Sequence, residues 1–371
     1  MTACPACLRR AWLVAHLAAH LETAWRGRRP LKDILALDDA ALIAALAGRR
    51  RPAVEAAHEA WSPDASLAAC AAAAVTPVCR HDAAYPARLR TGPGAPAVLH
   101  VAGDPARLEA LVGGDVHDGA PAAAIVGTRR ASPEALEVAT ALGRGLAAAG
   151  VTVVSGMALG VDSAAHQGAL DAGGPTVAVL ACGPERPYPA SKRALHRRLV
   201  AERLVVSELP PGTPPWRWSF PARNRIIAGL GRLTLVVEAA ERSGSLITAD
   251  FAADLGRDVA AVPGRAWSPR TRGSNGLLRQ GAEVVLDVED ALDAVLGLDR
   301  PVTTGAASAG AELPGDLGRV LDAVAAGDHV PAAQADGPGV AAALAALADL
   351  EGRGLVRRAP GGRWVATGPG H

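Results

Sequence analysis

The stretch "RLTLVVEAAERSGSLITADFA", from Arg232 to Ala252, combines an apolar run, a polar turn with one glycine and a segment of helical character. Similar runs recur between Ala122 and about Leu296, as "AAAIVG", "VTVVSG", "PTVAVLACG", "RLVVSE", "DVAAVPG" and "AEVVLDV". Short apolar runs that alternate with helical segments are typical of parallel strands covered by helices on both faces. The sequence therefore predicts an α/β fold, a Rossmann-like, mostly parallel sheet with helices on both faces, over residues 122–298.

The segments on either side of this domain differ in composition. Residues 1–75 are rich in Ala and Leu at helical spacing, as in "LKDILALDDAALIAAL", and predict a small helical N-terminal region. Residues 76–121 hold short β-prone pieces separated by Pro and Gly and are interpreted as a connector. Residues 299–313 have the composition of a linker. Residues 314–371 predict helices followed by a hairpin with the turn Pro360-Gly361-Gly362, the order of a C-terminal winged-helix-like domain.

The composition limits the classes of function. Half of the 371 residues are hydrophobic and the net charge is only +1, so a basic binding site has to be local. Five cysteines are too few and odd in number for a disulfide scaffold, which is typical of a reducing compartment. The sequence shows neither a secretory signal nor an apolar window of membrane-spanning length. We therefore expect a cytoplasmic protein without a membrane partner.

The turns that follow the predicted strands contain arginine, serine and glycine residues that favour the binding of an anion. Ligands of open parallel sheets bind outside the carboxyl ends of the strands, where helix N-termini offer free amides. In "GTRRASPE", Gly127 permits a tight turn, Ser132 caps the next helix, and Arg129 lies beside its N-terminus. In "SGMALGVDSAAH", Ser155 and Gly156 stand where a phosphate could approach the backbone. The glycine spacing is not G-x-G-x-x-G, so we expect no nicotinamide and no other cofactor.

Asp162 and His166 stand four residues apart on the helix predicted after this second turn. Such a pair could carry out acid–base chemistry. An Asp–His pair at this spacing more commonly stabilises a helix, and this second interpretation is favoured.

The segment "WRWSFPARNR", Trp216 to Arg225, concentrates aromatic and basic residues in a chain with 3% aromatics. No acidic residue stands between Glu208 and Glu238, which leaves a local excess of arginines there. Arginine binds phosphates through a planar fork and aromatic rings stack on bases, and single-stranded nucleic acid requires both. The alternative is that the aromatic side chains pack the loop onto the core. Further on, Ser243, Gly244 and Ser245 open a helix and offer hydroxyls and amides to an anion.

The combination of F-P-x-R-N-R with S-G-S-L-I-T-A, together with "GTRRAS" and "SGMALGVDSAAHQGAL", resembles the DNA-processing protein A family, also called DprA or Smf. The resemblance spans about Ala122 to Leu286, close to half the chain. It implies a DNA-binding protein, not an enzyme. Such a protein would bind single-stranded DNA, form a homodimer, protect incoming DNA and load the recombinase RecA onto it during natural transformation.

The resemblance also implies which residues bind DNA. The family's G-S-R-x-x-S turn falls on Gly127, Thr128, Arg129 and Ser132, with Arg129 as a phosphate ligand and Thr128 in place of the usual serine. Phe220 and Arg217 correspond to the family's pocket, and Arg223, Asn224 and Arg225 complete the motif. Alternatively, either Arg223 or Arg225 is a structural residue that holds the loop through internal hydrogen bonds. The full predicted set is Gly127, Thr128, Arg129, Ser132, Ser155, Gly156, Arg217, Phe220, Arg223, Asn224, Arg225, Ser243, Gly244 and Ser245.

Two other classes of protein compete with this interpretation. Nucleotide-processing enzymes of the phosphoribohydrolase (lysine-decarboxylase-like) type carry P-G-G-x-G-T-x-x-E after a strand. Here the corresponding turn reads "EAAERSGSLITA", which argues against that enzyme. A winged-helix regulator of duplex DNA would read bases with "GVAAALAALADLEGRG", which has no base-reading side chain before Arg353.

The N-terminus contains one candidate for a metal. Cys4, Cys7, His16 and His20 have the side-chain types that bind zinc, but the spacing is shorter than in common zinc fingers. Two thiols and two helical histidines without a metal are the favoured interpretation.

Overall fold

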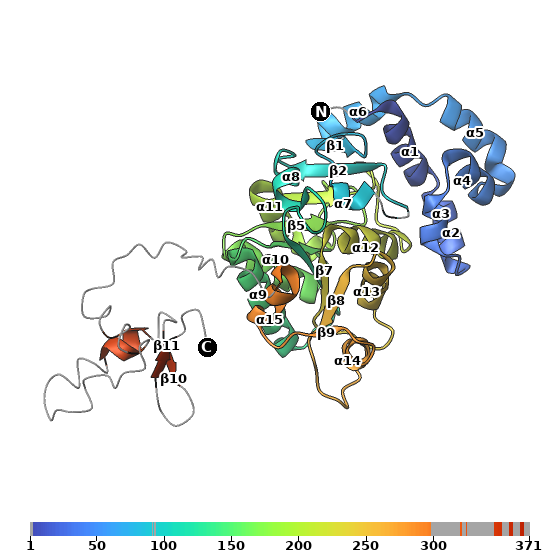
Figure 1. Cartoon of the computed structure of the whole chain (residues 1–371). Helices are drawn as coiled ribbons and strands as arrows, with labels where there is room; N and C mark the ends of the chain where they lie inside the picture. Colours follow the sequence, from blue (N-terminus) through green and yellow to red (C-terminus); the bar gives the residue numbers. More distant parts are fainter. Residues whose placement is uncertain are drawn as a thin grey trace, which may run out of the picture. The chain divides into compact units, whose positions relative to one another are not determined.

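The structure is a computed structural model that describes residues 3–90, 92 and 94–297, and, further on, residues 320, 324, 345–350, 356–358 and 364–366. The chain divides into two compact units, residues 1–299 and 300–371, and each is described by itself (Figure 1). No helix within these described residues is both long enough and apolar enough to cross a membrane.

A nine-stranded sheet with the order β1-β2-β6-β5-β4-β3-β7-β8-β9 forms the centre of the first unit. From β6 to β9 all neighbouring strands are parallel. These strands are β3 (Ala122–Val126), β4 (Thr152–Ser155), β5 (Thr176–Val179), β6 (Leu204–Ser207), β7 (Leu233–Val236), β8 (Asp258–Ala261) and β9 (Glu283–Val284). The predicted Rossmann-like, mostly parallel sheet is confirmed.

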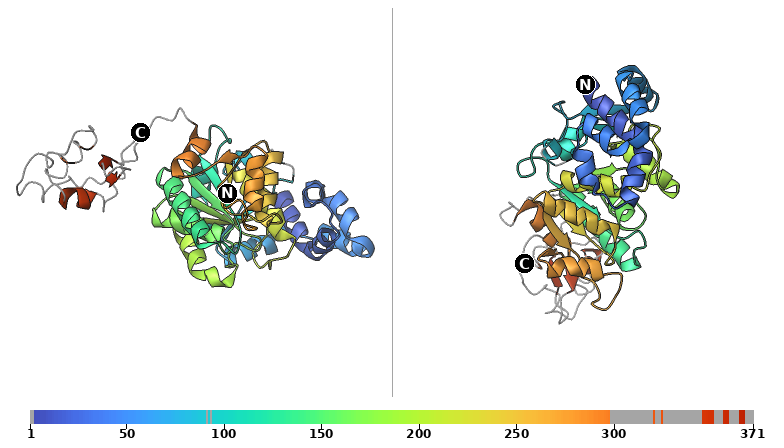
Figure 2. Two further views of the ribbon diagram at one scale, coloured as in Figure 1. Left: turned by 90° about the horizontal axis from the view of Figure 1, so that it is seen from below. Right: turned by 90° about the vertical axis from the view of Figure 1, so that its right-hand side faces the viewer.

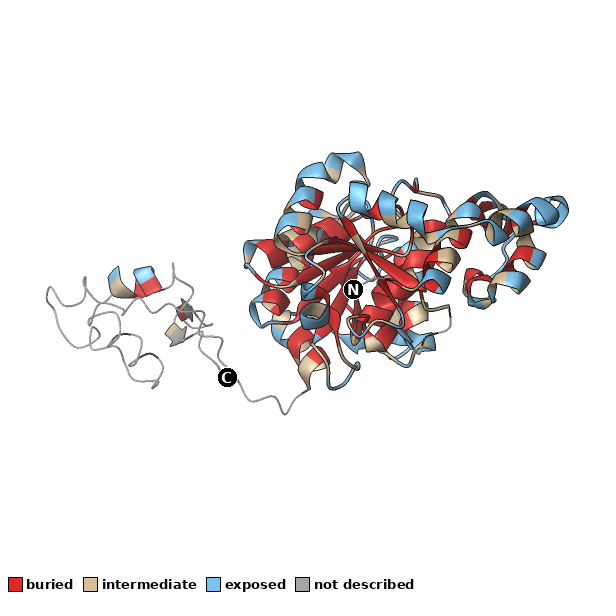
Figure 3. Cartoon of the chain, turned by 90° about the horizontal axis from the view of Figure 1, so that it is seen from above, coloured by how far each residue is buried: buried red, intermediate tan, exposed pale blue. Residues whose placement is uncertain are grey.

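Helices cover both faces of the sheet because successive strand residues point to opposite sides. In β3, Ala122, Ala124 and Val126 belong to one buried cluster, and Ala123 and Ile125 belong to the other. The first cluster contains side chains of α12 (Ser219–Leu230) and α13 (Gly244–Asp254). The second contains side chains of α9 (Pro133–Ala148), α10 (Val161–Asp171) and α15 (Val288–Leu296). Figure 3 shows the strands buried between helices whose outer faces are exposed.

The remaining helices of this part lie around the sheet. They are α7 (Ala87–Arg90), α8 (Arg107–Val112), α11 (Arg193–Glu202), α14 (Arg272–Arg279) and the 3₁₀ turn η2 (Ala190–Lys192).

Residues 76–121, interpreted from the sequence as a connector, supply two strands to the same sheet. β1 (Val75–Cys79) pairs antiparallel with β2 (Val98–Gly103), which pairs antiparallel with β6. Val78 and Leu99 are fully buried. Pro77 obscured the pattern, since proline cannot donate to a ladder and is tolerated here because β1 is the edge strand.

The N-terminal residues form the predicted helices, and these pack onto the sheet unit rather than forming an independent core. The helices are α1 (Pro5–His16), α2 (Ala18–Arg26), α3 (Leu31–Ala36), α4 (Asp39–Leu46), η1 (Gly48–Arg50), α5 (Arg51–Glu59) and α6 (Pro63–Ala72). In Figure 1 and Figure 2 the blue helices α2 to α5 form a lobe beside the sheet. Leu13, Leu17 and Leu42 share one buried cluster with Leu209 and Trp218, which precede α12.

In the second unit, β10 (Val356–Arg358) and β11 (Trp364–Ala366) pair antiparallel on either side of the predicted turn. Residues 345–350 are helical, and Leu347, Leu350 and Val356 belong to a small buried cluster. The predicted linker over 299–313 and most of the predicted winged-helix-like domain lie outside the described residues.

Candidate nucleic-acid interface

Three side chains from three different turns meet at the carboxyl edge of the sheet. Arg129 follows β3 and is exposed, and its Cζ lies 5.0 Å from the centroid of the Phe220 ring at the start of α12. The ring of Tyr188, which follows β5, lies 5.3 Å from that of Phe220, and Tyr188 is 40% exposed. A cation over a half-buried aromatic face, next to a second exposed ring, can bind a phosphate and a base together.

Tyr188 was missed in the sequence. It stands in "GPERPYP", a proline-rich turn that precedes a basic segment and was not among the predicted DNA-binding turns. The feature of the sequence that could have pointed to Tyr188 is the rarity of tyrosine, since the chain has only two.

Arg223 belongs to the interior. It is 7% exposed, and its guanidinium donates hydrogen bonds to the carbonyl oxygens of Gly156 and, at 2.8 Å, of Val179. Its Nη2 lies 3.9 Å from Oδ2 of Asp162, which is also buried. Burial lowers the pKa of Arg223 and raises that of Asp162, and each partner's charge opposes the shift of the other. Arg223 thus links the turn after β4 to the end of β5, and its Cζ lies 5.8 Å from the centroid of the Phe220 ring.

The predicted residues Ser155 and Gly156 have internal partners. Ser155 is fully buried and donates its hydroxyl to the Ile125 carbonyl at 2.6 Å. A Cβ on Gly156 would lie 2.5 Å from Arg223 Cζ, so glycine here makes room for the arginine rather than for a ligand.

Arg225 and Asn224 also hold the protein together. Arg225 is 6% exposed and its guanidinium donates to Glu208 Oε1 at 2.5 Å and to the Gly94 carbonyl at 3.0 Å. Asn224 donates its amide to the Gly244 carbonyl at 3.1 Å. The sequence left open which of Arg223 and Arg225 holds the loop internally, and in the structure both do.

The helix N-terminus after β3 is already bonded to a carboxylate. Ser132 caps α9 as predicted, accepting the Ala135 N–H at 3.2 Å. Its hydroxyl donates to Glu238 Oε2 at 2.8 Å and its N–H donates to Oε1 at 3.2 Å. Since Ser132 caps the helix and is itself bonded to Glu238, the anion-binding capacity of the turn rests on the exposed Arg129.

Gly127 and Thr128 shape the same turn. Gly127 packs so closely on α10 that a Cβ would lie 2.6 Å from Val161 Cγ2. The Thr128 hydroxyl accepts the Arg130 N–H at 3.2 Å, and the Thr128 N–H donates to the Glu238 carbonyl at 2.8 Å. These contacts fix the direction in which Arg129 leaves the sheet.

The N-terminus of α13 is more open. Ser243 caps the helix, accepting the Ser245 N–H at 3.4 Å, and the two hydroxyls lie 2.7 Å apart. Gly244 is exposed, and apart from its chain neighbours and the backbone of its own helix turn no described atom lies within 4 Å of the position a Cβ would take there. Of the predicted Ser243-Gly244-Ser245 turn, Gly244 is therefore the exposed residue, whereas Ser245 is buried.

Of the two residues directly before α12, Arg217 lies at the surface and Trp218 lies in the core. Arg217 is exposed, as a phosphate contact requires. Trp218 is fully buried, and its backbone N–H donates to Glu22 Oε2 at 3.1 Å on α2. For this tryptophan the packing alternative is confirmed, because it joins the loop to the N-terminal helices.

His166 is not arranged for acid–base chemistry. It is fully buried, and burial lowers its pKa to about 3. Thr176 donates its hydroxyl to the Val153 carbonyl at 2.7 Å, so His166 Nδ1, 2.7 Å from that hydroxyl, must be the donor. The neutral histidine therefore packs α10 against the sheet.

The predicted N-terminal metal candidates separate in the structure. Cys4 and Cys7 lie beside Cys79 and His81 rather than beside His16 and His20. His16 stacks on Trp12 with ring centroids 4.7 Å apart. Cys79 and His81 were missed because they stand far along the chain from Cys4 and Cys7, at the end of β1 and just after it.

Comparison with known proteins shows the family of this chain. A family model described as DNA recombination-mediator protein A matches residues 76–296, which include β2 and all of β1 except Val75. The chain is 41% identical over 297 residues to the putative DNA processing protein DprA of Mycobacterium tuberculosis, covering 76% of this chain and 74% of that protein. It is 42% identical over 172 residues to the DNA processing protein DprA of Streptococcus pneumoniae, covering 46% of this chain and 61% of that protein.

Two solved structures share the fold. The X-ray structure of DNA processing protein A from Streptococcus pneumoniae has a TM-score of 0.62 at 30% identity and covers 79% of this chain and 98% of that chain. DNA processing protein A from Helicobacter pylori, solved to describe its single-stranded DNA binding mode, has a TM-score of 0.50 at 28% identity and covers 57% of this chain and 92% of that chain. The resemblance seen in the sequence is confirmed, and the chain belongs to the DNA processing protein A (DprA) family.

Proposed function

We propose that this chain binds single-stranded DNA across the loops at the carboxyl edge of its sheet. The observation that carries the proposal is the contact of Arg129 with Phe220, a phosphate-binding cation held on an aromatic face that Tyr188 extends. The Helicobacter pylori relative, whose structure concerns single-stranded DNA binding, supports it.

In this proposal the predicted residues have two different roles. Arg129, Arg217 and the open backbone at Gly244 contact phosphates, and Phe220 stacks on a base. Buried residues position this surface, and they are Ser155, Gly156, Arg223 and Arg225.

Membership of the family supports a proposal for the finer biological role. We propose a cytoplasmic, homodimeric protein without catalytic activity that protects incoming single strands and loads the recombinase RecA onto them during natural transformation. For residues 314–371 we propose a winged-helix-like domain, which the β10–β11 hairpin supports.

The test is fluorescence anisotropy of labelled single-stranded and duplex oligonucleotides, titrated across salt with the full chain. We expect the chain to prefer single strands and Arg129→Ala to weaken this binding. The slope of log affinity against log salt concentration, called the salt slope below, should become shallower by about 0.7 because one phosphate contact is lost. Arg144→Ala is the matched control, because this exposed arginine lies on α9 about 16 Å beyond the helix start. Equal or absent binding to both oligonucleotides would contradict the proposal and call for nucleotide-hydrolysis assays.

A further inference from the structure

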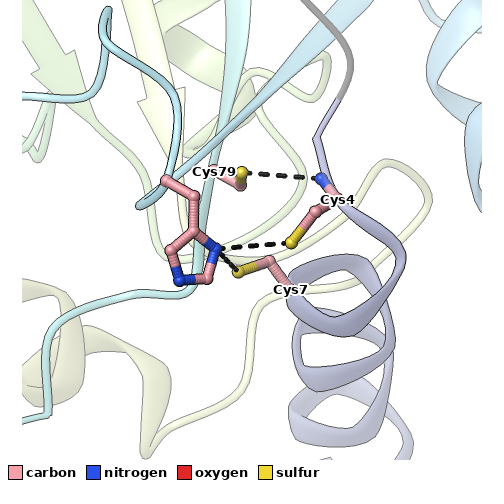
Figure 4. A group of neighbouring side chains, drawn as sticks. Cys4, Cys7 and Cys79 are labelled. Atoms are coloured by element: carbon pink, nitrogen blue, oxygen red, sulfur yellow. Dashed lines mark hydrogen bonds between the residues drawn. The ribbon is translucent and has the colours of Figure 1, made fainter.

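Cys4, Cys7, Cys79 and His81 bring four metal-binding atoms together at the edge of the sheet. One atom from each side chain lies within 4.8 Å of the others. Cys4 directly precedes α1 and Cys7 lies in its first turn, whereas Cys79 ends β1 and His81 follows it. Figure 4 shows the three cysteines converging from the start of the helix and from the strand. The fold thus joins residues 74 positions apart, from Cys7 to His81.

The distances fit a tetrahedral site. His81 Nδ1 lies 3.4 Å from Cys4 Sγ and 3.4 Å from Cys7 Sγ. With zinc–sulfur bonds of about 2.3 Å and zinc–nitrogen bonds of about 2.0 Å, a tetrahedron separates nitrogen from sulfur by about 3.5 Å. One ion can therefore contact His81 and both helical cysteines with little movement.

The surroundings suit thiolate ligands. The Cys4 N–H points to Cys79 Sγ at 3.5 Å, a hydrogen bond that a thiolate accepts better than a thiol. Cys7 and Cys79 are buried in an apolar cluster that includes Leu8 and Val98, while His81 is exposed. The site is thus shielded on the protein side and open to an entering ion on the histidine side.

We propose that Cys4, Cys7, Cys79 and His81 bind one structural Zn²⁺ ion. Three thiolates and one imidazole in tetrahedral order select zinc over hard cations such as Mg²⁺. Four protein ligands close the coordination sphere, so the ion stabilises the fold and has no open position for catalysis. On binding, the three thiols release their protons to solvent and neutral His81 coordinates through Nδ1.

The ion would fasten α1 to the edge strand β1. Leu13 and Val14 of α1 belong to the buried cluster that contains Trp218, so the position of α1 affects the loop before α12. Zinc would thus hold the N-terminal helices on the sheet unit.

The first experiment measures zinc in the full chain, purified under reducing conditions without chelator, by elemental analysis and by release with a mercurial reagent. We expect one zinc per chain in the wild type. His81→Ala should lose most of it, and His81→Cys should restore it because a fourth thiolate is an equally good ligand. His16→Ala and His20→Ala are matched controls and should keep it.

A second experiment removes the ion. The chelated protein should melt at a lower temperature, recover on addition of Zn²⁺, and with Co²⁺ give the visible absorption of a tetrahedral thiolate complex. A metal-free wild type that takes up neither ion would overturn the proposal. So would zinc that survives His81→Ala, zinc lost in His16→Ala, or iron with acid-labile sulfide in place of zinc. A Cys4–Cys7 disulfide in the reduced preparation, detected by thiol counting, would overturn it in favour of a redox pair.

Discussion

Trp218 and Phe220, two residues apart on the chain, lie in opposite environments. Trp218 is fully buried among the N-terminal helices, whereas Phe220 is half-buried, with Arg129 and Tyr188 against its ring. Substituting each aromatic should therefore change a different property of the protein.

Replacing Phe220 by alanine should weaken single-strand binding by about 1–3 kcal/mol, because a base loses its stacking surface. Phe220→Trp keeps an aromatic face and should retain most of the affinity. Anisotropy titrations measure both variants, and melting curves check that they are folded. A folded alanine variant with wild-type affinity would show that Phe220 only packs.

Replacing Trp218 by alanine should instead destabilise the chain by about 3–5 kcal/mol, the cost of emptying a large buried site. Urea unfolding at equilibrium measures this loss. Trp216→Ala, which changes a half-buried neighbour, is the control and should cost less. Equal small losses for both would mean that the N-terminal helices contribute little to stability.

Arg223→Met should destabilise the protein by about 3–5 kcal/mol, because Asp162 would be left as a buried charge without its partner. Adding Asp162→Asn should recover part of the loss, since the amide is neutral. The salt slope of DNA binding should stay at the wild-type value, in contrast to Arg129→Ala. Normal stability with a shallower slope would instead place Arg223 on a phosphate.

Acid should destabilise the fold through His166. The pKa of its buried imidazole is lowered to about 3 by burial, so between about pH 6.5 and pH 3 the unfolded chain binds a proton that the folded chain does not. The contribution of neutral His166 to the free energy of unfolding is fully present above the pKa of the unfolded state. It decreases as the pH falls, by about 2 kcal/mol at pH 5.

His166→Gln isolates this contribution. His100, whose pKa burial lowers to about 4, acts in the same direction, and the raised pKa of Asp162 acts in the opposite one. Urea unfolding near pH 7 and pH 5 should therefore show a smaller loss in the variant than in the wild type. Identical pH dependence would mean that His166 gains its proton without unfolding.

Much of the sheet unit could be predicted because its signals are local. Apolar runs of four to six residues predict buried strands, and Gly, Ser and Pro at the following turns predict helix starts, as Ser132 and Ser243 show. The edge strand β1 was harder to assign, because Pro77 is typical of a loop and only pairing with β2 makes this segment a strand.

By itself, the sequence determined the α/β class and the family, since each depends on residue types at short spacing. The assignment of DNA binding to particular loops stays a prediction. Tertiary structure alone decided that Arg223 and Arg225 are internal, that Trp218 is core, and that Tyr188 joins Phe220. It also showed that the neighbours of Cys4 and Cys7 are Cys79 and His81, and not His16 and His20 as the sequence spacing suggested. The physical reason is the same in each case, because burial and convergence depend on which distant segments pack together, and spacing along the chain does not encode that.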